Sequence, residues 1–210
     1  QSTRGEYDGR QLSVADLQLL DTTTASDAVR LLFLTEQSAL EKALEFVVQG
    51  NTAQMNDKAF VDELKRWIRF NGADALSTGD GLFSASSGNP TVPAWLGSLM
   101  FGLFFTPKAE NDKYARHMRS SAGLAVFVGQ TAEKANWVEV GRAYERFALQ
   151  ATSLGVRTAH LNQPIEVPSV RLQFASFLGI GPMRPDLVLR FGRGPALPAS
   201  PRRPVQAVLV

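Results

Sequence analysis

The sequence predicts an α+β domain in which helices cover a central sheet. Three apolar runs typical of buried strands lie at Val29–Thr35, Ala122–Gly129 and Asp186–Gly192. Between these runs, apolar residues recur at the three- and four-residue spacing of amphipathic helices. A chain of 210 residues with 44% hydrophobic and 20% charged residues can bury a core of this kind. We therefore expect one domain over residues 1–210.

The first third of the chain carries helix and strand signals in turn. Ser13 followed by Asp16 predicts a helix capped by the serine hydroxyl, and the first strand follows it. Ser38 and Glu41 form a capping box before a second helix. A third helix is expected to start at Asp57.

Residues 71–111 form an excursion from this pattern. Gly, Ser and Pro are frequent up to Pro93, and the apolar run Ala94–Phe105 follows. This run is well below the ~20 residues that cross a bilayer, so no membrane span is expected. An apolar segment of this size has to be buried against something, and we expect it to serve as a lid or as a dimer contact.

The second half of the chain is more regular. After the strand at Ala122–Gly129, a long amphipathic helix starts at Thr131 and is stopped by Gly155. A shorter helix from Ser169 to Leu178 precedes the last strand, Asp186–Gly192. A proline-rich segment then leads to a tail of alternating apolar residues, which predicts an edge strand added to a partner's sheet.

Composition excludes several classes of function. With 22 Lys and Arg against 20 Asp and Glu, the net charge of +2 gives no large cationic field, and we expect no nucleic-acid partner. The chain has no cysteine and only two histidines, so neither a metal site nor a disulfide is expected. No P-loop, nucleophile elbow or dinucleotide-binding glycine motif occurs, and no side chain stands out as catalytic.

Three separated segments carry residues that suit a phosphate-bearing ligand. Ser2 and Arg4 open the chain, and Arg202 and Arg203 stand between two prolines near its end. Arginine binds phosphate through bidentate, charge-assisted hydrogen bonds. The third segment, residues 161–169, is a loop stiffened by two prolines whose backbone amides would face a ligand. The alternative interpretation is two solvated surface patches and a tight connection between elements.

These segments, in this order, resemble the FMN-dependent nitroreductase family. The opening is similar to the end of the family's arginine-x-serine-x-basic motif, with Ser2 and Arg4 in place. "LNQPIE" resembles its proline-x-glutamate loop, and "SPRRPVQAVLV" resembles its C-terminal basic element and tail. The stretch from "RSSAGLAVFVG" to "LVLRFGRGP" is similar to the C-terminal half of tandem, Acg-type proteins, some of which are exported by the twin-arginine route.

The resemblance implies a three-layer sandwich, with a central, mostly antiparallel sheet flanked by helices, that forms a homodimer with swapped termini. It implies FMN as cofactor and NAD(P)H as co-substrate, with hydride passing through the flavin to a quinone or nitroaromatic-type acceptor. The protein would act as an oxidoreductase that needs little acid or base catalysis from its side chains. The cofactor-binding residues implied are Gln1, Ser2, Arg4, Pro164, Ile165, Glu166, Val167, Arg202 and Arg203.

The resemblance also implies a role for each group of these residues. Gln1 and Ser2 would lie along the phosphate and ribityl chain, and Arg4 would reach the pyrimidine edge of the flavin. The backbone of Pro164–Val167 would lie over the hydride-accepting nitrogen. Arg202 and Arg203 would hold the phosphate.

One family element has no counterpart in this chain. An asparagine that contacts the flavin normally lies between the first helix and the first strand, where this chain reads "LLDTTTASDAVRLLF". Two alternatives to the enzyme follow: a non-catalytic protein that binds or sequesters flavin, or a half-module completed by the N-terminal half of a longer chain. We expect a cytoplasmic location, or a periplasmic one if the full-length chain carries a twin-arginine signal.

Overall fold

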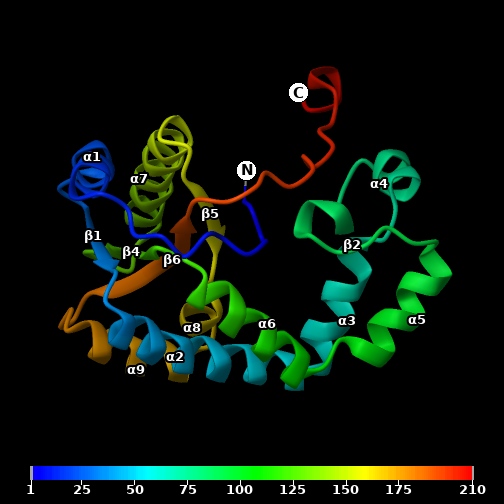
Figure 1. Ribbon diagram of the computed structural model, residues 1–210, viewed down its shortest axis with the longest axis horizontal. Coiled ribbons are helices and arrows are strands. Elements are labelled where there is room, and N and C mark those ends of the chain that lie inside the picture. The colour runs from blue at the N-terminus through cyan, green and yellow to red at the C-terminus, as the bar shows by residue number, and fades with distance from the viewer. Residues whose placement is uncertain (1, 210) are drawn as a thin grey trace.

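The computed structural model describes residues 2–209 and has an α+β architecture (Figure 1). The helices are α1 (Val14–Thr24), α2 (Gln37–Asn56), α3 (Lys58–Trp67), α4 (Gly72–Thr78), α5 (Ala94–Phe104), α6 (Pro107–Arg119), α7 (Lys134–Ser153), α8 (Gln163–Glu166) and α9 (Pro168–Leu178). The strands are β1 (Val29–Leu34), β2 (Ile68–Arg69), β3 (Leu82–Phe83), β4 (Gly123–Gly129), β5 (Arg157–His160) and β6 (Arg184–Gly192). Short 3₁₀ turns occur at η1 (Ser84–Ser87) and η2 (Val205–Ala207).

The central sheet is antiparallel. Within residues 2–209 it has four strands in the order β1-β4-β6-β5, and every residue of β4 is buried. The outer edge of β5 is met by the start of the chain, where Ser2 forms a parallel bridge with Thr158. This contact brings the N-terminal segment to the edge of the sheet.

Helices cover both faces of the sheet, so the fold has three layers (Figure 1). On one face, α1 and α7 pack over alternate sheet residues such as Phe127, Leu189 and Phe191. On the other face, α2, α6, α8 and α9 enclose a second core around Val126 and Val188. The two-residue period of the strands places these two sets on opposite faces. The predicted α+β sandwich with a mostly antiparallel sheet is confirmed.

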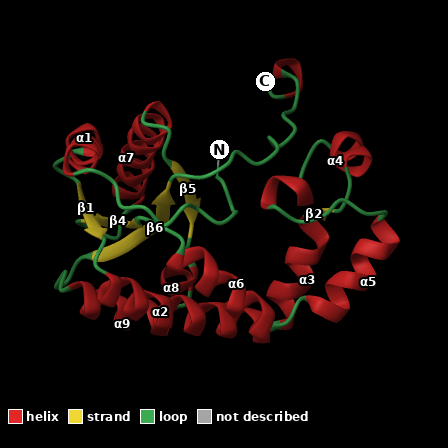
Figure 2. Cartoon of the chain, viewed as in Figure 1, coloured by secondary structure: helices red, strands yellow, loops and turns green. Residues whose placement is uncertain are grey.

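An extension of the chain from α3 to α5 lies beside the sheet; it consists of helices joined by loops and the short strands β2 and β3 (Figure 2). It starts where α2 ends at Asn56, and it leads into α6 at Pro107. The α6 end of the predicted excursion packs on α2, where Asn51 Nδ2 donates to Asn111 Oδ1 at 2.7 Å. The extension therefore includes α4 and α5, whereas α6 belongs to the layer over the sheet.

Several local expectations can be compared with the structure. Ser13 caps α1 by accepting from the Asp16 backbone N–H at 3.0 Å, as predicted. Asp57 likewise caps α3. The capping box at Ser38 and Glu41 is wrong: α2 begins at Gln37, and Glu41 instead accepts two hydrogen bonds from Arg119 on α6, at 2.8 and 2.9 Å.

Three other differences concern the start of a helix, a short strand and the tail. Helix α7 begins at Lys134 rather than Thr131, although Gly155 follows its end with φ of +67°, as a helix stop requires. Strand β5, which is only four residues long, was not predicted. The tail forms the turn η2 rather than a strand within its own chain. Nowhere between residues 2 and 209 does a helix have the length and apolar character needed to cross a membrane.

Candidate functional site

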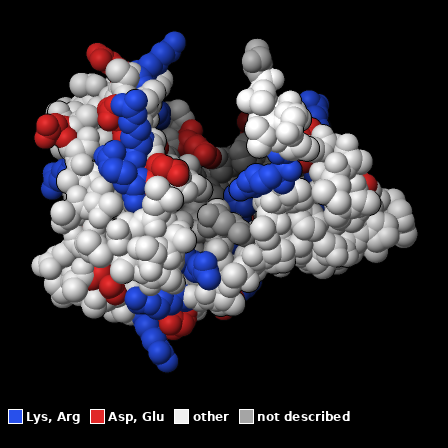
Figure 3. Space-filling model, turned by 90° about the horizontal axis from the view of Figure 1, so that it is seen from above, with Lys and Arg blue, Asp and Glu red and all other residues white. Residues whose placement is uncertain are grey.

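A cavity of about 390 Å³ lies where the edge of the sheet, helices α2 and α6 and the extension meet. Seen from above, the surface is hollowed between the sheet-containing part and the extension, and Lys and Arg side chains lie on the borders of the hollow (Figure 3). The cavity is lined by residues from widely separated parts of the chain, including Arg4, Lys113, Tyr114, Gln163, Glu166 and Arg190. We call it the main cavity.

The N-terminal segment is fixed against the sheet on one side of the main cavity. Thr3 N–H donates to the Thr158 carbonyl at 2.8 Å, and the Tyr7 hydroxyl donates to the Thr3 carbonyl at 2.9 Å. Arg190 Nη2 donates to the Gly5 carbonyl at 2.7 Å. These bonds hold Arg4, which lies between Thr3 and Gly5, at the cavity wall.

Arg190 is the buried cation of the site, with 1% of its surface exposed. Its guanidinium lies 4.2 Å from the centre of the Tyr7 ring. Burial lowers the pKa of Arg190 and raises the pKa of Tyr7 to about 12. Its hydrogen bonds go to backbone carbonyls and one serine hydroxyl, and within residues 2–209 it forms no ion pair with a carboxylate.

Sequence reasoning missed Arg190, although its position in the last strand is a signal that could have identified it. The side chain follows Val188 by two residues in the last strand, so strand alternation places it on the same inward face as a buried valine. An arginine at a core-facing position has to find acceptors inside the protein.

Helix α8 forms the opposite wall. Its close packing on α2 depends on Gly50, because a Cβ there would lie 2.3 Å from the Gln163 carbonyl oxygen. Gln163 Nε2 donates to the Tyr114 hydroxyl at 2.6 Å, while Gln163 Oε1 is buried without a hydrogen bond among the described residues. Gln54 Nε2 donates to Glu166 Oε2 at 2.6 Å and holds that carboxylate at the cavity rim.

The structure brings some of the proposed cofactor ligands together. Arg4 and Glu166 line the same cavity, and Arg4 Nη1 donates to Ser87 Oγ of the extension at 3.4 Å. Ser2 lies at the sheet edge with a buried hydroxyl that has no partner in the part of the chain described. Gln1 lies outside the described residues.

The proline-containing segment is a helical turn rather than an open loop. Pro164 and Ile165 are buried in it, and Val167 packs against the same core. The backbone N–H groups of Ile165 and Glu166 both donate to the Asn162 carbonyl at 2.9 Å. These two amides are therefore used within the turn.

Arg202 and Arg203 are not in the main cavity. They line a separate hollow of about 430 Å³ beside the α4 segment, together with Gly79 and Asp80. Arg202 donates only weakly, to the Ser200 and Pro201 carbonyls at 3.4 and 3.5 Å. Within one chain, the C-terminal arginines and Arg4 thus belong to different surfaces.

The charges of the main cavity favour a ligand with anionic groups. Glu110 pairs with Lys113 at 2.5 Å, whereas neither Arg4 nor Arg190 has a carboxylate partner among the salt bridges of residues 2–209. Burial and the neighbouring cations Arg190, Lys113 and Arg116 lower the pKa of His117 to about 4. His117 is therefore neutral at pH 7, and the positive charge comes from the arginines.

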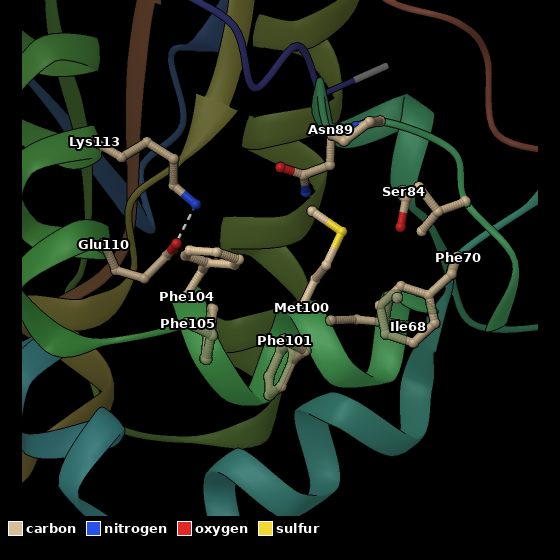
Figure 4. Close-up of a pocket in the computed structure, with 13 residues that line it drawn as sticks. Ile68, Phe70, Ser84, Asn89, Met100, Phe101, Phe104, Phe105, Glu110 and Lys113 are labelled. Carbon is tan, nitrogen blue, oxygen red and sulfur yellow. Dashed lines mark hydrogen bonds and ion pairs between the residues drawn. The ribbon is translucent and has the colours of Figure 1, made fainter. Parts of the chain in front are cut away.

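An apolar side chamber of about 210 Å³ adjoins the main cavity (Figure 4). Phe70, Met100, Phe101 and Phe104 line it, and Figure 4 shows the Glu110–Lys113 ion pair at its border. The chamber shares Ile68, Asn89, Phe105, Glu110 and Lys113 with the main cavity. A flat apolar ring would fit beside whatever occupies the main cavity.

Comparison with solved structures identifies the fold. The whole chain superposes on the FMN-dependent nitroreductase NfnB from Mycobacterium smegmatis, solved with NADPH, with a TM-score of 0.63, 10% identity and 93% of that chain covered. The chain has a nitroreductase-like fold.

Two further nitroreductases solved with bound FMN show the same likeness over the whole of this chain. The protein from Desulfitobacterium hafniense gives a TM-score of 0.61 at 13% identity and is covered over 92% of its length. The protein from Bacteroides fragilis gives 0.58 at 16% identity and is covered over 93%. No protein-family model and no curated protein sequence matches the chain.

Proposed function

We propose that the protein is an FMN-dependent NAD(P)H oxidoreductase and that the main cavity is its flavin site. The observation that carries the proposal is one cavity at the sheet edge of a nitroreductase-like fold, lined by two arginines without carboxylate partners. When bound, FMN would take reducing equivalents from the nicotinamide and deliver them to an acceptor.

The residues of the cavity suit FMN. Its volume of about 390 Å³ lies in the ~300–1,000 Å³ range of small-ligand sites. Gln163 Oε1 is buried at this cavity without a partner in the described chain, and a flavin offers hydrogen-bond donors on its ribityl chain and ring edge. Arg4 and Arg190 would supply positive charge toward the phosphate or the electron-rich ring edge.

The side chains would bind and orient rather than exchange protons. Burial raises the pKa of Tyr114 to about 12, so its hydroxyl keeps its proton at pH 7 and can donate into the cavity. The same hydroxyl oxygen already accepts a hydrogen bond from Gln163 Nε2, so its own proton is left to donate to a ligand. Glu166, held by Gln54, would lie beside the ligand at the cavity rim.

The apolar side chamber would take the acceptor, a quinone or nitroaromatic-type ring. Its phenylalanine rings can stack on such a compound, and Lys113 stands where a polar substituent would emerge. Because the chamber shares lining residues with the main cavity, the acceptor would lie beside the flavin.

A homodimer with exchanged tails is part of the proposal. Trp95, Leu99 and Leu103 recur at four-residue spacing on α5 and are 71%, 54% and 63% exposed. The tail carries exposed Val205 and Leu209. A second copy would cover these surfaces, and exchange of the tails would carry Arg202 and Arg203 away from the α4 hollow, so that they could hold the phosphate.

The test is an absorbance spectrum of the desalted protein after incubation with FMN, followed by anaerobic addition of NADPH or NADH. We expect flavin bands that bleach with one nicotinamide and return with a quinone. Bands that persist would favour the alternative of a non-catalytic flavin-sequestering protein, which the missing asparagine element motivates. Failure to retain FMN would overturn both the enzyme and the flavin-sequestering protein. The remaining hypothesis would be a half-module, which is tested by adding an N-terminal half in trans.

A further inference from the structure

The extension packs on itself rather than on the central sheet. Its strands β2 and β3 pair with each other in a sheet of their own. Phe70 lies directly against α5, because a Cβ at Gly97 would be only 2.3 Å from Phe70 Cγ. Asp57 both ends α2 and caps α3, and α5 meets α6 at Phe105 and Thr106. The extension is therefore one packed unit that is joined to the rest of the chain by two short junctions.

The main cavity lies between this unit and the sheet-containing part, where the surface is hollowed (Figure 3). Leu64, Ile68 and Ser87 line the cavity from the extension. Tyr114 and Gln163 line it from the other side. A rotation of the extension about its two junctions would therefore change the width of the main cavity.

The proline-rich segment 193–204 crosses from the end of β6, past the N-terminal segment, toward the extension (Figure 1). We call this segment the strap. A Cβ at Gly5, in the N-terminal segment, would lie 3.9 Å from Leu197 Cδ2. A Cβ at Gly88, which follows η1 in the extension, would lie 3.9 Å from Leu197 Cδ1. One side chain of the strap thus lies against both the N-terminal wall of the main cavity and the extension.

The strap ends on the α4 segment. A Cβ at Gly79 would lie 3.7 Å from Arg203 Cγ, so the aliphatic part of this arginine rests on the end of α4. Arg69 fixes Asp80 beside it through two hydrogen bonds to Oδ1, at 2.6 and 3.1 Å. The pKa of Asp80 is lowered mainly by the bond from Arg69, and the charge of Arg203 lowers it further. Residues 201–209 are all exposed, so this end of the strap can detach without uncovering a core.

We propose that residues 193–204 hold the extension against the N-terminal segment and thereby close the main cavity in the single chain. Leu197 and Arg203 are the two contacts of the strap with the extension, and no strand of the extension pairs with the central sheet within residues 2–209. Release of Arg203 lets the extension turn about the junctions at Asp57 and Phe105. Exchange of the tails between two copies would break the same contact. The inference rests on the proposed function only in taking the main cavity as the flavin site.

A disulfide that locks the strap on α4 tests the proposal. The chain has no cysteine, so Gly79→Cys with Arg203→Cys introduces the only two thiols. A disulfide needs its Cβ atoms about 3.5–4.5 Å apart. Arg203 Cγ, whose place the new sulfur takes, lies 3.7 Å from the Gly79 Cβ position, so the bond can form with a small adjustment. The oxidised and reduced forms of this variant then differ only in the lock. Failure of the disulfide to form within the monomer would overturn the proposal.

Two measurements compare the locked and unlocked forms. In the flavin-free protein, hydrogen exchange at the Gly88 and Asn89 N–H groups, which bond within the η1 turn, should be about tenfold slower in the oxidised form. Association of FMN, followed by the change in flavin fluorescence after rapid mixing, should also be about tenfold slower in the oxidised form. Equal association rates in the two forms would overturn the proposal. If neither form binds FMN, the proposed function fails, and equal hydrogen exchange in the two forms would then refute the strap.

Leu197→Ala tests the strap without a crosslink. It removes the contact with both Gly5 and Gly88, so hydrogen exchange at Gly88 and FMN association should each become about threefold faster or more. Leu172→Ala is the control, because Leu172 is 74% exposed on α9 and lies outside the strap. Unchanged hydrogen exchange at Gly88 in Leu197→Ala, or an equal effect of the control, would contradict the role of the strap.

Discussion

Replacing Arg190 by methionine tests whether this buried cation organises the N-terminal wall of the main cavity. Methionine keeps most of the side-chain volume and removes the charge and all donors. The 2.7 Å bond to the Gly5 carbonyl is the shortest that Arg190 makes, and hydrogen bonds to charged groups contribute ~1.5–3 kcal/mol. The desolvated contact with Tyr7 adds ~2 kcal/mol. The longer bonds, at 3.3–3.5 Å, add less.

Together these contributions predict that Arg190→Met lowers the free energy of unfolding by about 3–5 kcal/mol. With a urea slope of about 2 kcal/mol per molar, the unfolding midpoint falls by about 1.5–2.5 M. Hydrogen exchange at Thr3 N–H should accelerate as well, because its bond to Thr158 depends on the anchored segment. The control is Arg142→Met, since Arg142 pairs with Glu139 on the surface and its loss should cost under ~1 kcal/mol. A loss for Arg190→Met no larger than for the control would refute the reasoning.

Three other predictions concern pH, packing and cofactor binding. Between pH 7 and pH 5 the free energy of unfolding should fall by about 2 kcal/mol, because His117 takes up a proton near pH 6.5 in the unfolded chain but only near pH 4 in the folded one. Urea titrations at the two pH values should show a smaller fall in stability for His117→Gln than for the unaltered chain. Gly50→Ala should cost about 1–3 kcal/mol by pressing on Gln163, whereas Gly102→Ala should cost nothing, as read from thermal midpoints. Arg4→Ala should weaken FMN binding more than tenfold by calorimetry, and equal affinity would place the anion elsewhere.

The sequence predicted the fold from signals that are local. Ser13 and Asp57 cap helices because a side-chain oxygen within three residues satisfies the free amides of the first turn. The same reasoning wrongly predicted a capping box at Ser38 and Glu41, because the Glu41 carboxylate accepts hydrogen bonds from Arg119 on another helix instead. A capping motif is a local preference, and a tertiary ion pair can outweigh it. The strand β5 was missed because four residues are too few to show a two-residue period.

The candidate site was predictable only in part. Arg4 and Glu166 carry local motif signals, and the structure places both on one cavity. Gln163 and Tyr114 had no such signal, because their bond joins residues 49 positions apart. The position of Arg202 and Arg203 depends on where the tail goes after the prolines, and no periodicity constrains that path.

The arrangement of the main cavity couples its two walls through the strands β5 and β6. Arg190 lies opposite Ala159 in the sheet and reaches the N-terminal segment, which in turn bonds to Thr158. At the end of β5, Asn162 continues into α8, where its Oδ1 accepts from the Val188 N–H at 3.1 Å and its carbonyl starts the turn. One short strand therefore sets the distance between Arg4 and Glu166. A substitution that loosens β5 should weaken both walls together, so the free energy of unfolding and the ligand affinity should fall in parallel. Arg4→Ala, in contrast, should lower the ligand affinity without lowering the free energy of unfolding.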